Sequence, residues 1–136
     1  MPADTMIKCN ALIVCGGVTK DPESNTITLI NIFKKVCAPK LPVTVNDWWL
    51  YFSVYGGRGK YDIEVVITHP DGVKSSGFNQ VINFDELSSN YFTPAGQLQG
   101  LELTQEGKYI FDLYAAKGDV HEKLASTFVF IYREKR

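Results

Sequence analysis

The stretch that decides the fold runs from Trp48 to Thr68 and reads WWLYFSVYGGRGKYDIEVVIT. Apolar residues take every second position on both sides of a glycine-rich segment at 56–59. Such alternation is typical of strands with one buried face, because successive side chains point to opposite faces. The stretch therefore predicts strands at 48–55 and 61–68. We expect their buried rows to be Trp48, Leu50, Phe52 and Val54, and Tyr61, Ile63, Val65 and Ile67.

We expect these two strands to pair with each other as an antiparallel hairpin whose loop is 56–59. Tyr55 then faces Lys60, and each residue of one buried row faces a residue of the other buried row. A slip by one residue would turn Asp62 and Glu64 toward the core, so the faces of the hairpin determine its register.

The rest of the chain repeats short β-rich runs, at 7–15, 26–33, 73–78, 98–103, 108–115 and 124–132. Turn signals separate them, among them Gly16-Gly17, Asp21-Pro22, Pro70-Asp71-Gly72 and Gly118-Asp119. No segment has an apolar stripe of helical period that is long enough for a helix, and we expect at most one helical turn, at 85–89. The pattern predicts an all-β sandwich or barrel, formed as a single domain over residues 1–136.

One local signature lies near the C-terminus, where Leu103, Gly107 and Tyr109 open an alternating strand. In β-sandwiches, a tyrosine at the start of the penultimate strand forms hydrogen bonds to the backbone a few residues upstream. Gly107 would supply the tight turn that this contact requires. The other interpretation is an ordinary core tyrosine after a turn, and in both cases Tyr109 has a structural role.

The last hairpin is expected to turn near Gly118-Asp119. Its second strand contains the run Phe128–Tyr132, which is apolar on both faces. Such a run is typical of a central strand or of a strand at an interface, and the sequence does not choose between these two interpretations.

The overall charge limits the classes of partner. The chain has 14 basic and 15 acidic side chains, a balance that excludes a strongly basic nucleic-acid binder. No run approaches the ~20 apolar residues of a membrane-spanning helix. The first apolar run, at 11–15, is too short for the core of a signal peptide. We therefore expect a cytoplasmic protein without a membrane or nucleic-acid partner.

The residues that most often carry chemistry are few. Cys9, Cys15 and Cys37 are odd in number and lack CxxC spacing, which favours free structural thiols in a reducing compartment. His69 and His121 are expected as solvated turn residues, since neither has a cysteine or an acid at ligand spacing. No GxSxG motif is present. We expect no metal, no cofactor and no catalytic residue.

The outer face of the expected hairpin is the best functional lead. The glycine-rich loop lacks the GxxxxGK[ST] spacing and opens a strand, so a hairpin loop explains it better than a phosphate site does. Exposed Trp and Tyr are typical of protein interfaces and of surfaces that stack on sugars. The alternative is that a second layer, such as the segment 85–100, covers the rings. The candidate interaction surface comprises Trp49, Tyr51, Tyr55, Arg58 and Lys60.

Several motifs follow one another in a recognisable order: Cys9–Lys20, TLINIFKKV at 28–36, Pro39-x-x-Pro42, THPDG at 68–72 and GKYIFDL at 107–113. This order resembles a family of small uncharacterised bacterial proteins with an immunoglobulin-like β-sandwich. The chain departs from the family at Asn31, where a small residue is more usual, and in its longer aromatic segment 48–55. The resemblance implies an immunoglobulin-like antiparallel β-sandwich of about seven to eight strands, and it implies no catalytic or binding residues.

These observations favour a non-enzymatic cytoplasmic module that binds a protein partner or assembles as a homo-oligomer. One alternative is a carbohydrate-binding domain or a small enzyme whose site is assembled from loops. A second alternative is a structural subunit of a phage or of a secretion apparatus. Fold alone does not distinguish among these functions.

Overall fold

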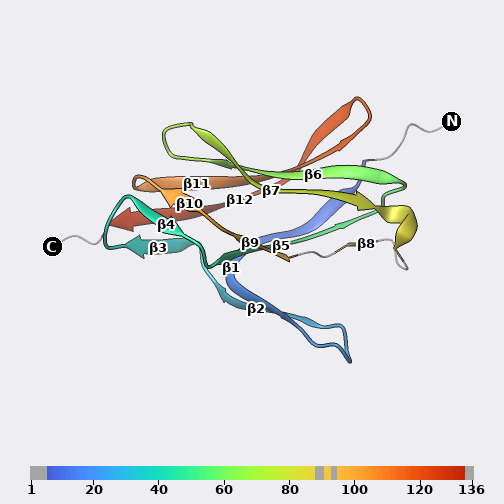
Figure 1. Cartoon of the computed structure of the whole chain (residues 1–136), viewed down its shortest axis with the longest axis horizontal. Helices are drawn as coiled ribbons and strands as arrows, with labels where there is room; N and C mark the ends of the chain where they lie inside the picture. Colours follow the sequence, from blue (N-terminus) through green and yellow to red (C-terminus); the bar gives the residue numbers. More distant parts are fainter. Residues whose placement is uncertain (1–5, 88–90, 93–94, 134–136) are drawn as a thin grey trace.

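The computed structural model describes residues 6–87, 91–92 and 95–133 (Figure 1). This part of the chain is all β apart from one short 3-10 helix, η1 (Phe84–Glu86), so the predicted class is confirmed. The helix begins one residue before the expected segment 85–89 and overlaps it at 85 and 86; residues 88 and 89 are outside the described residues. The strands are β1 (Lys8–Lys20), β2 (Ile27–Ile32), β3 (Lys35–Ala38), β4 (Val43–Val45), β5 (Trp48–Tyr55), β6 (Lys60–Thr68), β7 (Lys74–Asn83), β8 (Tyr91–Phe92), β9 (Ala95–Leu98), β10 (Leu101–Leu103), β11 (Gly107–Lys117) and β12 (Val120–Arg133).

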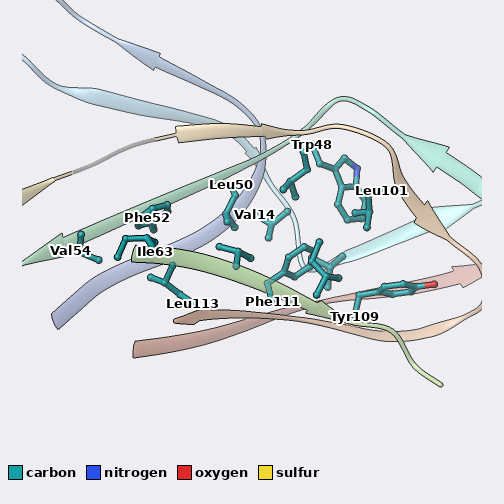
Figure 2. Packing of buried hydrophobic residues seen from close by; sticks show 14 of the residues in the cluster. Val14, Trp48, Leu50, Phe52, Val54, Ile63, Leu101, Tyr109, Phe111 and Leu113 are labelled. Atoms are coloured by element: carbon teal, nitrogen blue, oxygen red, sulfur yellow. The ribbon is translucent and has the colours of Figure 1, made fainter. Parts of the chain in front are cut away.

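Two sheets pack face to face. The first has the order β2-β1-β5, with β8 and β9 both on the far edge of β5, and the second has the order β3-β12-β11-β6-β7. All pairs are antiparallel except β3 with β12. Figure 1 shows the sheets as two layers, with the β1–β2 hairpin projecting from the first. The core lies between them, where Figure 2 shows Phe52 of β5 on one side and Phe111 of β11 on the other.

The short ribbon of β4 and β10 continues the first sheet beyond a kink. Val45 pairs with Leu101 and, three residues further along, Trp48 pairs with Leu98, so the register is continuous. At the kink the side chain of Asn46 replaces a ladder bond, because its Oδ1 accepts the backbone N–H of Gly100, between β9 and β10, at 2.8 Å. The described residues contain more strands than the seven to eight expected, because kinks of this kind divide long strands and because several edge strands are short.

The predicted hairpin of β5 with β6 is wrong in its pairing and right in its faces. β5 belongs to the first sheet, where Tyr55 pairs with Lys8, whereas β6 belongs to the second sheet, where Lys60 pairs with Asn83. Both predicted apolar rows are buried. The two strands form an arch whose rows face each other across the core. The alternation of apolar and polar residues is the same in a hairpin and in an arch, because it depends on which face of the strand is buried and not on which strand lies beside it.

The loop of this arch is packed against the core. A Cβ on Gly57 would lie 2.5 Å from side-chain atoms of both Ile7 and Phe84, so only glycine fits there. The backbone N–H of Phe84 donates to the carbonyl of Gly59 at 2.8 Å, and the N–H of Gly59 donates to Oδ1 of Asp85 at 3.1 Å. These contacts fix the loop beneath η1 and direct the chain from one sheet to the other.

The prediction for Tyr109 is confirmed. Its side chain is fully buried, and its hydroxyl accepts hydrogen bonds from the N–H groups of Thr104 at 2.9 Å and Gln105 at 3.2 Å. The same hydroxyl donates to the carbonyl of Gln105 at 3.0 Å. Gly107 has a φ of 135°, which L side chains rarely adopt. The tyrosine therefore joins the start of β11 to the segment that leaves β10.

Other turn predictions had mixed outcomes. The last hairpin turns at 118–119, as expected, and its register runs from Gly107 with Ile131 to Lys117 with Val120. The expected turn at 16–17 is wrong, because both glycines continue β1 and residue 17 pairs with β2. The run 98–103 is broken between β9 and β10.

Candidate interaction surfaces

The structure brings together only part of the candidate surface. Trp49, Tyr51 and Tyr55 share the outer face of β5; the first two are half-buried and Tyr55 is exposed. Arg58 lies exposed in the arch loop, and Lys60 begins β6 in the other sheet. From the segment 85–100, β8 and β9 lie beside β5 in its sheet, while 88–90 and 93–94 fall outside the described residues.

A more exposed set of rings lies on β12. Phe128, Phe130 and Tyr132 alternate on its outer face and are 36%, 43% and 40% exposed, while Val129 and Ile131 between them are buried. β12 is a central strand, between β3 and β11. Its double apolar pattern therefore belongs to a central strand that also presents apolar side chains to solvent. We call Phe128, Phe130 and Tyr132 the aromatic strip.

Lysines border the aromatic strip. The Nζ atoms of Lys34 and Lys108 lie 5.3 Å and 5.2 Å from the centre of the Phe128 ring. Nζ of Lys35 lies 4.8 Å from the centre of the Tyr132 ring. Cations at such distances are attracted by the negative faces of the rings. Sequence reasoning noted the apolar run and missed these lysines, because they come from distant segments that only the fold brings together.

The opposite end of the same outer face is acidic. Directly paired residues share a face of a sheet. Asp112 pairs with Val66, and further along β11 the acids Glu64 and Asp62 of β6 occupy the same face. Oδ1 of Asp112 is enclosed and has no hydrogen-bond partner within the described part of the chain, where Nζ of Lys123 is 3.9 Å away. The second sheet thus carries the lysines of the aromatic strip at one end of its outer face. At the other end three carboxylates outnumber one cation, Lys123, which pairs with Tyr114 in the same row as Glu64.

A separate cavity of about 570 Å³ opens where the β6–β7 turn meets the kink between β9 and β10. His69 lines it with Asp71 and Glu102, and Nε2 of His69 lies 3.2 Å from Oγ of Ser75. His69 lies in the expected turn, where its carbonyl accepts the N–H of Gly72 at 2.9 Å. Its ring is half-buried and packs on Tyr109 with centroids 5.1 Å apart. Sequence reasoning missed the cavity because two distant turns form it.

The remaining candidate groups are structural in position. Cys15 is fully buried, and burial raises the pKa of its thiol; burial likewise raises the pKa of the half-buried Cys9. Cys37 lies exposed on β3. His121 is exposed beside the last turn and stacks on Tyr114 with ring centroids 5.0 Å apart.

Residues 6–87, 91–92 and 95–133 can also be compared with what a metal site and a membrane span require. No group of three or more His, Cys, Asp or Glu side chains in these residues is placed to hold a metal ion. Across the same residues, no helix has the length and apolar character needed to cross a bilayer.

Comparison with known proteins places the chain in a family. A family model matches residues 10–123. The chain belongs to the DUF6941 family. DUF6941 is described as a family of unknown function, so the expectation of an uncharacterised family is confirmed, and the match itself specifies neither a bacterial origin nor a fold. Neither a curated protein nor a solved structure matches this DUF6941 chain.

Proposed function

We propose that this DUF6941 chain is a non-enzymatic protein-interaction domain of the bacterial cytoplasm. The observation that carries the proposal is the aromatic strip, in which three neighbouring outward positions of one strand are all aromatic and all exposed. The solvent side of a strand normally carries polar residues. Exposed apolar patches with a polar rim mark protein interaction sites, and aromatic residues are enriched in interfaces.

The proposal includes an immunoglobulin-like fold in a single domain. Two facing sheets of mainly antiparallel strands support it, as does the hydroxyl of Tyr109 bonded back to residues 104 and 105 at the start of the penultimate strand. In such folds, binding surfaces differ from one protein to the next, so the function must be argued from the surface itself.

Affinity capture of proteins from a bacterial lysate tests the role of the strip. Phe130→Ser in the aromatic strip is compared with Ile30→Ser on β2, because the two side chains are 43% and 42% exposed. We expect the wild-type chain and the Ile30→Ser control to retain the same specific protein and Phe130→Ser to lose it. The proposal would be contradicted if Phe130→Ser, shown to be folded by an unfolding midpoint in urea equal to that of wild type, retained the protein as well as wild type does.

The cavity beside His69 favours a second candidate function, the binding of a small polar ligand such as a sugar. Its volume falls within the range of about 300–1,000 Å³ that is usual for ligand sites. Buried side chains, among them Leu98 and Leu101, line it together with the polar groups Ser75 and Glu102. Titration with a panel of mono- and disaccharides, followed by NMR, should shift the signals of residues around the cavity. Glu102→Gln should weaken that response, and no shift with any sugar would rule out this candidate.

A further inference from the structure

We propose that the partner of the aromatic strip is a second copy of this chain, in a two-fold symmetric dimer formed through the outer face of the second sheet. The inference rests on the proposed interaction function and names its partner. In a two-fold dimer the same surface serves both subunits, so that surface must be complementary to itself. The distribution of charge and apolar area on this face meets that requirement.

The charges at the two ends of the face are complementary. Lys35 and Lys108 flank Phe130 in register at one end. Glu64 and Asp62 occupy the other end, where Lys123 offsets only one of the carboxylates and lies closest to Asp112. Six residues of β11 separate Lys108 from the position that pairs with Glu64, a span of roughly 20 Å at about 3.4 Å per residue. Consider a two-fold axis that lies parallel to the face and crosses β11 midway between these two positions. Rotation about this axis places the basic end of each copy over the acidic end of the other copy.

This arrangement favours a second copy over a partner of one charge. A uniformly acidic partner would be attracted by Lys35 and Lys108 and repelled by Asp62 and Glu64. The strip and the adjacent Ile110 would supply the apolar centre of the interface.

The face is large enough for such a dimer. The four long strands β6, β7, β11 and β12 are each about 4.8 Å wide and about ten residues long, at about 3.3 Å per residue, which gives a projected area of roughly 600 Å². The short β3 adds four residues at the edge. Side-chain relief raises the accessible area above this projection. A stable interface buries about 800 Å² per partner. The dimer should therefore form in a measurable, concentration-dependent way.

Sedimentation velocity on the purified chain at low salt, over a wide range of protein concentration, tests the inference. We expect wild type to dimerise, and Lys108→Glu and Glu64→Lys each to weaken the dimer by about tenfold or more, because each creates two repulsive contacts. An equimolar mixture of the two variants should restore association as a heterodimer, since both contacts then join opposite charges. The control Lys20→Glu makes the same charge change on β1 and should dimerise like wild type.

The outcomes separate this inference from the proposed function. A wild-type chain that stays monomeric, a dimer that Lys108→Glu leaves unchanged, or a mixture that associates no better than its components would each overturn the symmetric dimer. If urea unfolding shows that a charge-reversal variant is not folded, Lys108→Gln and Glu64→Gln replace it in the same sedimentation experiment. Each of these neutral variants is expected to weaken the dimer less than charge reversal does. Loss of a captured protein in Phe130→Ser alongside a monomeric wild type would uphold the interaction function and overturn only the second copy as partner.

Discussion

Removal of one hydroxyl group from Tyr109 should destabilise the whole domain. Tyr109→Phe keeps the buried ring and deletes the atom that joins β11 to residues 104 and 105. Three hydrogen bonds are lost, and two backbone N–H groups lose their acceptor. The ring still fills its site, so the change isolates the polar contribution of this contact.

The size of the effect follows from the number and burial of these bonds. Each hydrogen bond contributes about 1 kcal/mol net, and an unsatisfied buried donor costs more. Thr104 is exposed, so water can reach part of the freed backbone and limit that cost. We expect the free energy of unfolding to fall by about 2–3 kcal/mol. For a domain of this size, the melting temperature should fall by roughly 6–12 °C.

Urea unfolding followed by circular dichroism measures this loss as a shift in midpoint at constant slope. Tyr55→Phe is the matched control, because its side chain is 41% exposed on the outer face of β5. The control should change stability by no more than about 0.5 kcal/mol. A Tyr109→Phe variant as stable as this control would refute the reasoning, since the buried hydroxyl would then contribute nothing.

Three further predictions follow from particular side chains. Gly57→Ala should lower the free energy of unfolding by about 1–3 kcal/mol in urea, because its methyl group would overlap core side chains; wild-type stability would contradict the packing of the arch. Cys37 should react rapidly with a disulfide reagent and Cys15 only after unfolding, because Cys15 is fully buried and its thiol pKa is raised. A fast phase that survives in the double variant Cys9→Ser, Cys37→Ser would contradict this, because Cys15 is then the remaining thiol. The pKa of Asp21 lies below its ordinary value of 3.8, first because the backbone N–H of Glu23 donates a hydrogen bond to the carboxylate. The ionised carboxylate therefore stabilises the β1–β2 hairpin fully at pH values above 3.8, and this stabilisation is lost as the pH falls through the lowered pKa. An NMR titration of Asp21 should give a midpoint below 3.8, and Asp21→Asn should abolish the pH response of the hairpin amides.

The alternating pattern of the sequence was enough to identify the buried face of the long strands. Leu50 and Ile63 lie in the core as predicted, and Tyr109 forms the hydrogen bonds that its position after Gly107 indicated. These features are local, because the side chain period, the turn and the tyrosine involve residues within about ten positions of each other. A single sequence carries that information directly.

The neighbours of each strand could not be predicted in the same way. The rows of β5 and β6 would be buried equally in a hairpin and in an arch. What decided between them was the packing of Gly57 against Ile7 and Phe84, which lie 50 and 27 residues away along the chain. The short strands β3 and β4 were missed because their pairing depends on partners that come from distant segments.

The same division holds for the proposed interface. The apolar character of both faces of β12 could be predicted without a structure, because it follows from the five consecutive residues Phe128–Tyr132. It is the fold that leaves the outer rings exposed, places Lys35 and Lys108 beside them, and places Glu64 at the opposite end of the face. Burial and alternation are properties of one strand, whereas a surface is formed by several strands whose order in the sheet is set by long-range packing.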